Sequence, residues 1–470
     1  MLLDIFHRLP YPGKVVVASL QGYYLDWLRY GGDFEKRIAE IEKCERSSKE
    51  AIDAMVQAKL QLVLAQAFHH VPYYRNQWAE RRRQGDQSDW RVLANWPILS
   101  KDEVRRSPRA FLAENHSWFL VKSQTSGTSG KPLLLWQGKE ALRSWYAKSE
   151  VRLRRWYGVA RGENWGIFGG QLVTEVAQKK PPFWVWNHSW RQLYLSSYHL
   201  SPDLIGFYLD ALVEHKITYL LGYTSALVAV AQEMLARKRT DIRLKVVITN
   251  AEPLYPYQRK ILEAAFNCPV RETYGMSEMT VAASECEHGR LHLWPMAGAV
   301  EIIENGQRVP NGEVGELVAT GLINQDMPLI RYQTGDRGVL APDPSCPCGR
   351  NLPVLSHIDG RNDDVLYTTG GRAIGRLDTV FKADLPVSEV QIVQKQLDSL
   401  VVRYVPTERY SDDSSRIIAE RLRERMGPMR IEFECLEAIP RGPNGKFRSV
   451  VCELSGKHSE TPRTPQPSSL

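Results

Sequence analysis

The feature that most limits the fold of this chain is a regular alternation of apolar and helical segments between residues 165 and 273. Valine, leucine, isoleucine and aromatic residues gather in short runs that favour strands. These strands are expected at 165–170, 219–222, 245–249 and 270–273. Helices are expected between them at 203–215, 225–238 and 256–265. Strands that alternate with helices form parallel sheets, so the sequence predicts an α/β fold.

The flanking regions complete the predicted architecture. One long helix is expected over 34–68, and Ser100 followed by Glu103 predicts a capping box. Three strands joined in part by an Asn305-Gly306 turn predict a small β subdomain. The resulting prediction is a large α/β domain over 1–360 with a helical region to about residue 95, a small mobile α+β domain over 361–455, and a disordered tail over 456–470.

Composition narrows the class of protein. A chain of 470 residues is too long for one core, and 43% hydrophobic with 24% charged residues is ordinary for a globular protein. The net charge is 61 − 54 = +7, without one basic block, which argues against nucleic-acid binding. Seven cysteines argue against a disulfide framework, so a cytoplasmic location is expected.

No apolar run reaches the ~18 residues of a membrane helix, and the N-terminus is a poor signal peptide. The first segment could touch a membrane, but its apolar residues are too few to anchor the chain. They are Leu2, Leu3, Ile5, Phe6 and Tyr11.

The segment 123–132 gathers hydroxyls, two glycines and a lysine, Lys131. Glycines let backbone N–H groups turn inward, and hydroxyls add donors, which suits a polyphosphate. The spacing is not that of a Walker loop, because Gly127 and Gly130 are too close and Pro132 follows the lysine. By itself this segment is either a phosphate site or an ordinary loop.

Four further motifs follow it in order. They are Glu272–Glu278, Arg331–Asp336, Gly360–Asp364 and Pro440–Lys446. The series resembles the signature motifs of the adenylate-forming enzymes, a superfamily of acyl-CoA ligases, peptide-synthetase adenylation domains and luciferases. Within it the chain is most similar to the phenylacetate–CoA ligase branch, in its group associated with capsular polysaccharide. The resemblance runs from about residue 60 to about residue 452.

This resemblance implies ATP and Mg²⁺ as cofactors. Glu278 is implied as the carboxylate that holds Mg²⁺, Ser277 as a contact to the α-phosphate, and Tyr274 as the neighbour of the adenine, flanked by Gly275 and Met276. The β- and γ-phosphates are assigned to Ser126, Gly127, Thr128, Ser129, Gly130 and Lys131.

Asp336 follows a Thr-Gly turn, and a fixed carboxylate there can accept both ribose hydroxyls or simply form the turn. By resemblance, Arg361 is the second ribose or phosphate contact. Glu252 and Pro253 follow an apolar strand, and the family places this segment beside the adenine. Ligands of α/β sheets bind at the carboxyl ends of strands.

Lys446 lies on a C-terminal loop and is, by resemblance, the mobile lysine that bridges the carboxylate and the α-phosphate. It belongs to the small domain, so that domain must rotate, and Asp363 is the implied hinge. Rotation about a hinge residue is an ordinary way to separate two half-reactions.

Cys286, His292, Cys346 and Cys348 form a second constellation, with four ligands suited to tetrahedral Zn²⁺. The spacing alone leaves free buried thiols as an alternative, and His288 is a rival ligand. Similar cysteine and histidine sites in the phenylacetate–CoA ligase branch favour a structural zinc.

The acyl pocket and the acceptor are less constrained. Trp165, Phe168, Tyr223 and Asn250 are candidates for the pocket wall, although aromatic residues often only pack. Coenzyme A is the expected acceptor, but the run 367–378 departs from the family's Arg-Gly turn. Transfer to a carrier protein, an amine or a hydroxyl is the alternative, and a non-catalytic adenylate-binding scaffold is a third reading. A homodimer is left open.

Overall fold

The structure is a computed structural model, and its described part excludes residue 1 and several segments. The described residues are 2–124, 133–175, 177–252, 254, 256–359, 366–371, 373–374, 377, 380, 386–407, 409–437, 439 and 450–454. The chain forms two compact units, one from Met1–Thr125 with Leu133–Arg361 and the other mainly from Asn362–Leu470.

The first unit is built on one 13-stranded sheet with the order β12-β11-β13-β14-β15-β10-β9-β8-β7-β6-β3-β5-β4. Its first half along the chain comprises β3 (Trp165–Gly169), β4 (Trp184–Asn187), β5 (Gln192–Ser196), β6 (Tyr219–Tyr223), β7 (Val246–Asn250) and β8 (Val270–Gly275). β5, β3, β6, β7 and β8 are parallel, and β4 is antiparallel to β5. The predicted α/β class is confirmed.

The second half of the sheet is antiparallel. It comprises β9 (Ala282–Glu285), β10 (Leu291–Leu293), β11 (Gly298–Glu304), β12 (Gln307–Arg308), β13 (Gly315–Gly321), β14 (Tyr332–Leu340) and β15 (Val354–Asp359). β8 joins the halves, because its first residues pair with β7 and its last three with β9. The predicted β subdomain is therefore a continuation of the main sheet. Asn305 and Gly306 both have positive φ and form the β11–β12 turn, as predicted.

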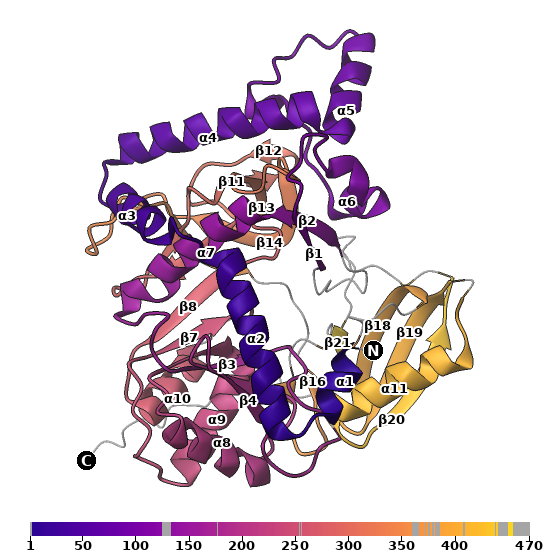
Figure 1. Cartoon of the computed structure of the whole chain (residues 1–470). Coiled ribbons are helices and arrows are strands. Elements are labelled where there is room, and N and C mark those ends of the chain that lie inside the picture. The colour runs from indigo at the N-terminus through magenta and orange to yellow at the C-terminus, as the bar shows by residue number, and fades with distance from the viewer. Residues whose placement is uncertain are drawn as a thin grey trace, which may run out of the picture. The chain divides into compact units, whose positions relative to one another are not determined.

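Helices α8 (Pro202–Glu214), α9 (Thr224–Ala236) and α10 (Pro256–Phe266) connect the parallel strands and cover one face of them (Figure 1). Leu220 of β6 points to the core beneath these helices, whereas its neighbours Tyr219 and Leu221 belong to a cluster on the other face. Because successive strand residues point to opposite faces, burial of both kinds shows that the strand is covered on both sides.

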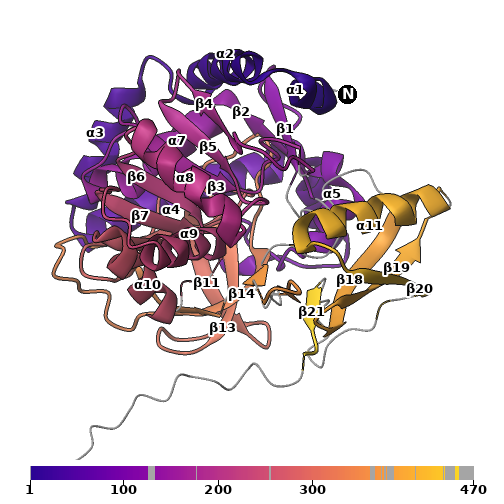
Figure 2. The same cartoon turned by 90° about the horizontal axis from the view of Figure 1, so that it is seen from below.

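The N-terminal part of the first unit is helical (Figures 1 and 2). Its elements are α1 (Leu2–Arg8), α2 (Tyr11–Arg29), α3 (Phe34–Glu45), α4 (Lys49–His70), α5 (Pro72–Arg83) and α6 (Lys101–Arg106), with a hairpin of β1 (Leu120–Gln124) and β2 (Leu134–Gly138) before α7 (Lys139–Leu153). The prediction of one helix over 34–68 is wrong, because Ser48 caps a new helix by accepting a bond from Ala51 N. The capping box at Ser100 and Glu103 is confirmed.

The second unit contains a four-stranded sheet of order β20-β19-β18-β21. Its strands are β18 (Val387–Gln396), β19 (Ser399–Pro406), β20 (Arg430–Cys435) and β21 (Val450–Cys452), beside the short pair β16 (Leu366–Tyr367) and β17 (Ala373–Ile374). Helix α11 (Asp412–Met426) packs on this sheet through Ile418 and Leu422. Among the described residues of the chain, no helix is long and apolar enough to cross a membrane.

Candidate functional site

Tyr223 and Asn250 end two neighbouring parallel strands, β6 and β7, and are directly paired in register. Asn250 Oδ1 is buried and has no hydrogen-bond partner in the described part of the chain. Ala251 follows with a φ of 66°, a strained value for a residue with a Cβ. An orphaned acceptor beside strained backbone, at the carboxyl ends of parallel strands, is typical of a ligand site.

Glu252 continues this segment, and its carbonyl accepts a hydrogen bond from Thr224 Oγ1 at 3.2 Å. Thr224 begins α9, directly after β6. The bond fixes the turn after β7 against the start of α9, the helix that connects β6 to β7. Pro253, which was predicted beside it, lies outside the described residues.

The Tyr274 hydroxyl donates to Asp336 Oδ2 at 2.7 Å. Three strands separate β8 from β14 in the sheet order, so the antiparallel half must curl to bring these side chains together. Asp336 is 6% exposed, and its own N–H donates to Thr334 Oγ1. The Thr334 hydroxyl in turn donates to the Leu317 carbonyl. The turn therefore fixes the backbone that carries the carboxylate, and Tyr274 holds the carboxylate itself.

Glu278 is buried at the end of the segment that follows β8. Its Oε1 accepts a hydrogen bond from the Tyr332 hydroxyl at 3.0 Å, and Lys101 Nζ lies 3.6 Å from the same oxygen. A single buried carboxylate is the protein ligand that Mg²⁺ commonly uses together with phosphate oxygens. The nearby ammonium adds a positive charge that suits the same phosphates.

The carbonyl of Ser277, which precedes Glu278, accepts a bond from Gln137 Nε2 of β2 at 3.0 Å. Thr280 Oγ1 donates to the sulfur of Met276 at 3.0 Å. Lys101, Gln137 and Tyr332 were not predicted as site residues. Tyr332 lies within the Arg331–Asp336 motif, but no sequence pattern near Lys101 or Gln137 indicates a contact with the Ser277–Glu278 segment.

Cys286, His292, Cys346 and Cys348 converge, with their ligand atoms within 4.8 Å of one another. Cys286 Sγ lies 3.6 Å from Cys346 Sγ, and Cys348 Sγ lies 3.4 Å from His292 Nε2. Tetrahedral zinc, with bonds of about 2.1–2.3 Å, separates its ligand atoms by roughly 3.5–3.8 Å. The four groups therefore fit one zinc ion, whereas His288 is exposed and is not part of the cluster.

The protonation of this cluster also suits a metal. His292 Nδ1 lies 3.3 Å from the Leu352 carbonyl, which leaves Nε2 to face the thiols. Burial lowers the pKa of His292 to about 4 and raises the pKa of the Cys346 thiol to about 12. An imidazole that stays neutral is a ready ligand, and a bound cation would favour the thiolates that burial disfavours.

Two of the predicted pocket residues have the surroundings of core residues. Phe168 is completely buried in the cluster beneath α8–α10. Trp165 stacks on Tyr219 and donates its indole N–H to the Trp190 carbonyl. These contacts favour a packing role for Trp165 and Phe168, and leave Tyr223 and Asn250 as the pocket candidates.

Several other predicted site residues lie outside the described part of the chain. They are Ser126, Gly127, Thr128, Ser129, Gly130, Lys131, Arg361, Asp363 and Lys446. Their roles remain predictions.

Comparison with protein families gives two matches. Residues 184–324 match the AMP-binding enzyme family, and residues 366–453 match the CapK C-terminal domain. The first match covers β4 to the segment after β13, including Asn250, Tyr274 and Glu278. The second covers most of the second unit.

Relatives in sequence agree with these matches. Protein CapK of Staphylococcus aureus is 27% identical over 366 residues, which is 76% of this chain and 79% of the relative. A phenylacetate-coenzyme A ligase of Aromatoleum evansii is 26% identical and covers 70% of this chain and 75% of its own. Among solved structures, 2-hydroxyisobutyryl-CoA ligase in complex with 2-HIB-AMP and CoA has a TM-score of 0.58 at 22% identity, covering 88% of this chain and 92% of that one. At this identity, the structural match shows a shared fold alone.

Proposed function

We propose that this chain, which matches the AMP-binding enzyme family over residues 184–324 and the CapK C-terminal domain over residues 366–453, is an adenylate-forming ligase that activates a carboxylic acid with ATP and passes the acyl group to coenzyme A. The observation that carries the proposal is that two side chains of β14 contact two residues of the Glu272–Glu278 motif. Asp336 is bonded to Tyr274, and Tyr332 of the same strand is bonded to Glu278. One strand thus holds the predicted ribose carboxylate and orients the predicted metal carboxylate.

The reaction has two half-reactions. A carboxylate oxygen of the acid attacks the α-phosphorus of ATP, pyrophosphate leaves, and an acyl-adenylate forms. The sulfur of the thiol then attacks the acyl carbon, and AMP leaves as the thiol loses its proton. Because both steps build charge on fixed oxygens, positioning and electrostatics are the main contributions that the protein makes.

Three side chains supply that positioning on the nucleotide side. Asp336 accepts hydrogen bonds from the ribose hydroxyls, and Tyr274 holds Asp336 while its ring lies against the adenine. Asn250 Oδ1, buried and lacking a partner among the described residues, accepts a bond from the bound substrate or nucleotide. A buried acceptor gains most from a ligand donor, because leaving it unsatisfied costs free energy.

Mg²⁺ would be held by Glu278 together with the phosphates of ATP. When bound, the ion neutralises charge on the leaving pyrophosphate. Tyr332 holds the Glu278 carboxylate in place, and Lys101 supplies a second positive charge beside it. Ser277, Lys131 and the other residues of the hydroxyl loop are proposed as the phosphate contacts, and Arg361 as the second ribose contact.

Lys446 is proposed to bridge the acid and the α-phosphate in the first half-reaction, with Asp363 as the hinge about which its domain turns. Zinc is proposed as a structural ion of the large domain, held by Cys286, His292, Cys346 and Cys348. All four ligands come from the protein, which leaves no open position for chemistry. The cysteines in the described part of the chain are free thiols, which suits a reducing cytoplasm.

The acceptor has a second candidate. The second unit matches the CapK C-terminal domain, and this domain follows the adenylation motifs in the chain. An acceptor site shaped by this domain would pass the acyl group to a carrier protein, an amine or a hydroxyl in place of coenzyme A. We place coenzyme A first because several relatives are named phenylacetate-coenzyme A ligases.

The test is acid-dependent ATP–pyrophosphate exchange over a panel of carboxylic acids, followed by product analysis with and without coenzyme A. We expect exchange with at least one acid, loss of exchange in Lys446→Ala, and normal exchange in Lys395→Ala, a control on the exposed side of β18. ATP binding without exchange for any acid would favour the scaffold. An acyl-CoA product would exclude the alternative acceptors, and exchange without thioester formation would favour them.

A further inference from the structure

Helix α2 lies along the outside of the first unit (Figures 1 and 2). It turns an apolar face to solvent. The outward side chains recur at helical spacing and form one continuous stripe. They are Val16, Val17, Leu20, Tyr23, Tyr24 and Trp27, and their exposed fractions run from 41% to 64%. A stripe this long is unusual on a free surface, because large exposed apolar patches mark sites of interaction.

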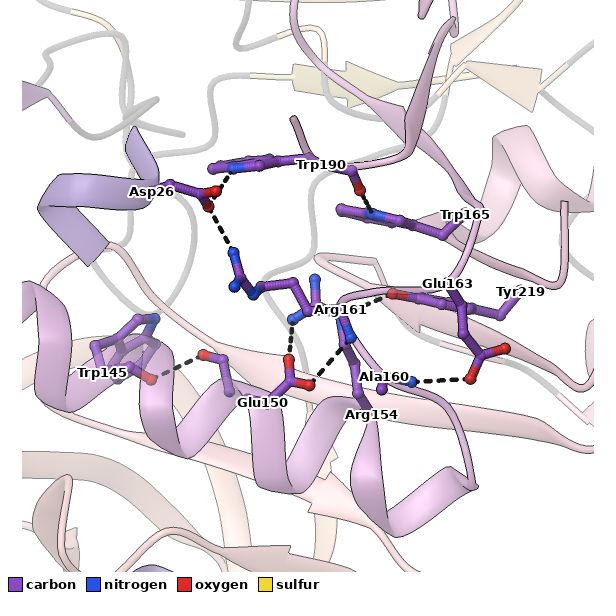
Figure 3. A network of polar contacts seen from close by, with 11 residues as sticks. Asp26, Trp145, Glu150, Arg154, Ala160, Arg161, Glu163, Trp165, Trp190 and Tyr219 are labelled. Atoms are coloured by element: carbon purple, nitrogen blue, oxygen red, sulfur yellow. Dashed lines mark hydrogen bonds and ion pairs between the residues drawn. The ribbon is translucent and has the colours of Figure 1, made fainter. Parts of the chain in front are cut away.

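The other side of α2 is fixed to the protein by polar contacts and by Leu25 and Leu28, which pack in apolar clusters. Asp26 accepts hydrogen bonds from Trp190 Nε1 at 2.7 Å and from the Arg161 guanidinium at 2.6 Å (Figure 3). Ser19 Oγ accepts a bond from the backbone N–H of His188. Gly22 lies so close to Asn187 that a Cβ would meet its side chain at 2.6 Å.

These contacts decide the orientation of the helix. Turning the apolar stripe inward would break the ion pair between Asp26 and Arg161 and the hydrogen bond from Trp190 to Asp26. The outward position of the stripe is therefore a stable feature of the fold. We call the six outward residues of α2 the apolar stripe.

The apolar surface extends beyond the stripe at both ends. The Trp27 ring lies 6.0 Å from Phe119, and Phe119 lies 5.7 Å from Trp118, which is 93% exposed. At the other end, Val16 and Trp186 line an open groove of about 620 Å³. The exposed tyrosines and tryptophans combine an apolar ring with a polar edge, which is the chemistry that collects at membrane–water interfaces.

The exposed charge on α1 and α2 is positive, whereas one exposed carboxylate, Glu214, lines the groove at the Val16 end. Among the exposed residues between 5 and 29, Arg8 carries a positive charge and no carboxylate is exposed. Lys139 Nζ lies 3.5 Å from the centroid of the Trp27 ring. The acidic residue of this helix, Asp26, is turned inward and paired with Arg161. Along the helix and at its Trp27 end, the apolar stripe therefore complements an anionic surface.

We propose that the apolar stripe docks this protein on the surface of a membrane that contains anionic phospholipid. The side chains enter the interfacial region with the helix in its plane, and the cations contact the headgroups. A symmetric contact with a second copy fits less well, because such a contact places the same residues of both copies together. The cations Lys139 and Arg8 would then lie on both sides of the contact, and the acid next to Lys139, Glu140, is already paired with Arg37. The proposal is independent of the proposed ligase activity.

Flotation of the full chain with vesicles tests the proposal, using phosphatidylcholine alone and phosphatidylcholine mixed with phosphatidylglycerol. We expect binding to the mixed vesicles that weakens as salt is raised, because surface charge is screened. Leu20→Glu should lower the partition coefficient by about tenfold or more, since one leucine loses its burial. Leu62→Glu is the matched control, because Leu62 is 62% exposed in the middle of α4 and Leu20 is 64% exposed.

Circular dichroism and thermal melting check that each variant folds. If Leu20→Glu does not fold, Tyr24→Ser takes its place. A Lys139→Gln, Arg8→Gln double variant should lose binding to the anionic vesicles selectively. Absence of wild-type binding, or binding that Leu20→Glu and Tyr24→Ser leave unchanged, would overturn the proposal. A third result would also overturn the proposal: the wild type is a dimer in light scattering, Leu20→Glu dissociates the dimer, and no vesicle binding is found. The stripe would then join two copies.

Discussion

The Tyr274 hydroxyl and Asp336 Oδ2 are 2.7 Å apart, although three strands lie between β8 and β14 in the sheet. This bond joins the Tyr-Gly motif to the Thr-Gly-Asp motif. It makes the orientation of the proposed ribose carboxylate depend on the residue proposed to lie against the adenine. The two parts of the nucleoside are therefore predicted to be recognised as one unit.

Tyr274→Phe should raise the KM for ATP in pyrophosphate exchange by about tenfold with a smaller change in kcat, because a hydrogen bond to a charged group contributes about 1.5–3 kcal/mol. Asp336→Asn should have a larger effect. Tyr208→Phe is the control, since the Tyr208 hydroxyl donates to a backbone carbonyl in the core below α8. An unchanged KM for ATP in Tyr274→Phe would contradict the proposed role.

Glu278→Gln should lower exchange by about a hundredfold and raise the Mg²⁺ concentration needed for half-maximal activity, because the amide is a weaker ligand. Lys101→Met should weaken ATP binding more than it changes the dependence on Mg²⁺. The control is Glu304→Gln, at a partly exposed ion pair with Arg337. The assignment fails if the Mg²⁺ dependence of Glu278→Gln matches that of the wild type.

The purified protein should contain about one zinc ion per chain by mass spectrometry of metals. Cys346→Ser and Cys348→Ser should lose the ion and lower the Tm by several degrees, since metal binding contributes to folding. Cys435→Ser, at an exposed cysteine, should keep it. A folded wild-type protein purified without chelators and free of zinc would exclude the site.

Lys148 should destabilise the protein at neutral and acidic pH. It is buried in α7, donates to Ser144 Oγ, and burial lowers its pKa from 10.5 to about 7, with Lys59 and Arg152 adding to the effect. Below pH 7 the folded state carries the charge. Between pH 7 and 10.5 the unfolded chain binds a proton that the folded state has released, so the free energy of unfolding rises with pH.

Lys148→Met should therefore raise the Tm near pH 6, by a stabilisation on the order of 1–4 kcal/mol, and the gain should shrink towards pH 10. Thermal melting over a pH series measures it. Lys49→Met, at an exposed lysine on α4, is the control. A gain that does not change with pH would show that packing, and not the charge, explains it.

Local patterns predicted the local structure well. The alternation after residue 165, the capping box at Ser100 and the Asn305-Gly306 turn depend on neighbouring residues, and all three were found. The long helix over 34–68 was wrong because the periodicity continues across a cap at Ser48, which also is a local signal. The small β subdomain was also predicted, but a pattern of strands does not say that β8 joins it to the parallel strands in one sheet.

The sequence was enough to establish the class of fold and the family motifs, since both are written in runs of adjacent residues. The folded chain alone brought together Lys101 with Glu278 and Tyr274 with Asp336, and it placed the four predicted zinc ligands within reach of one ion, because these contacts join strands and helices that are far apart in sequence. It also decided that α2 turns its apolar face outward. Helical spacing reveals two faces, but only Asp26, Ser19 and Gly22 in contact with residues 161–190 select which one is buried.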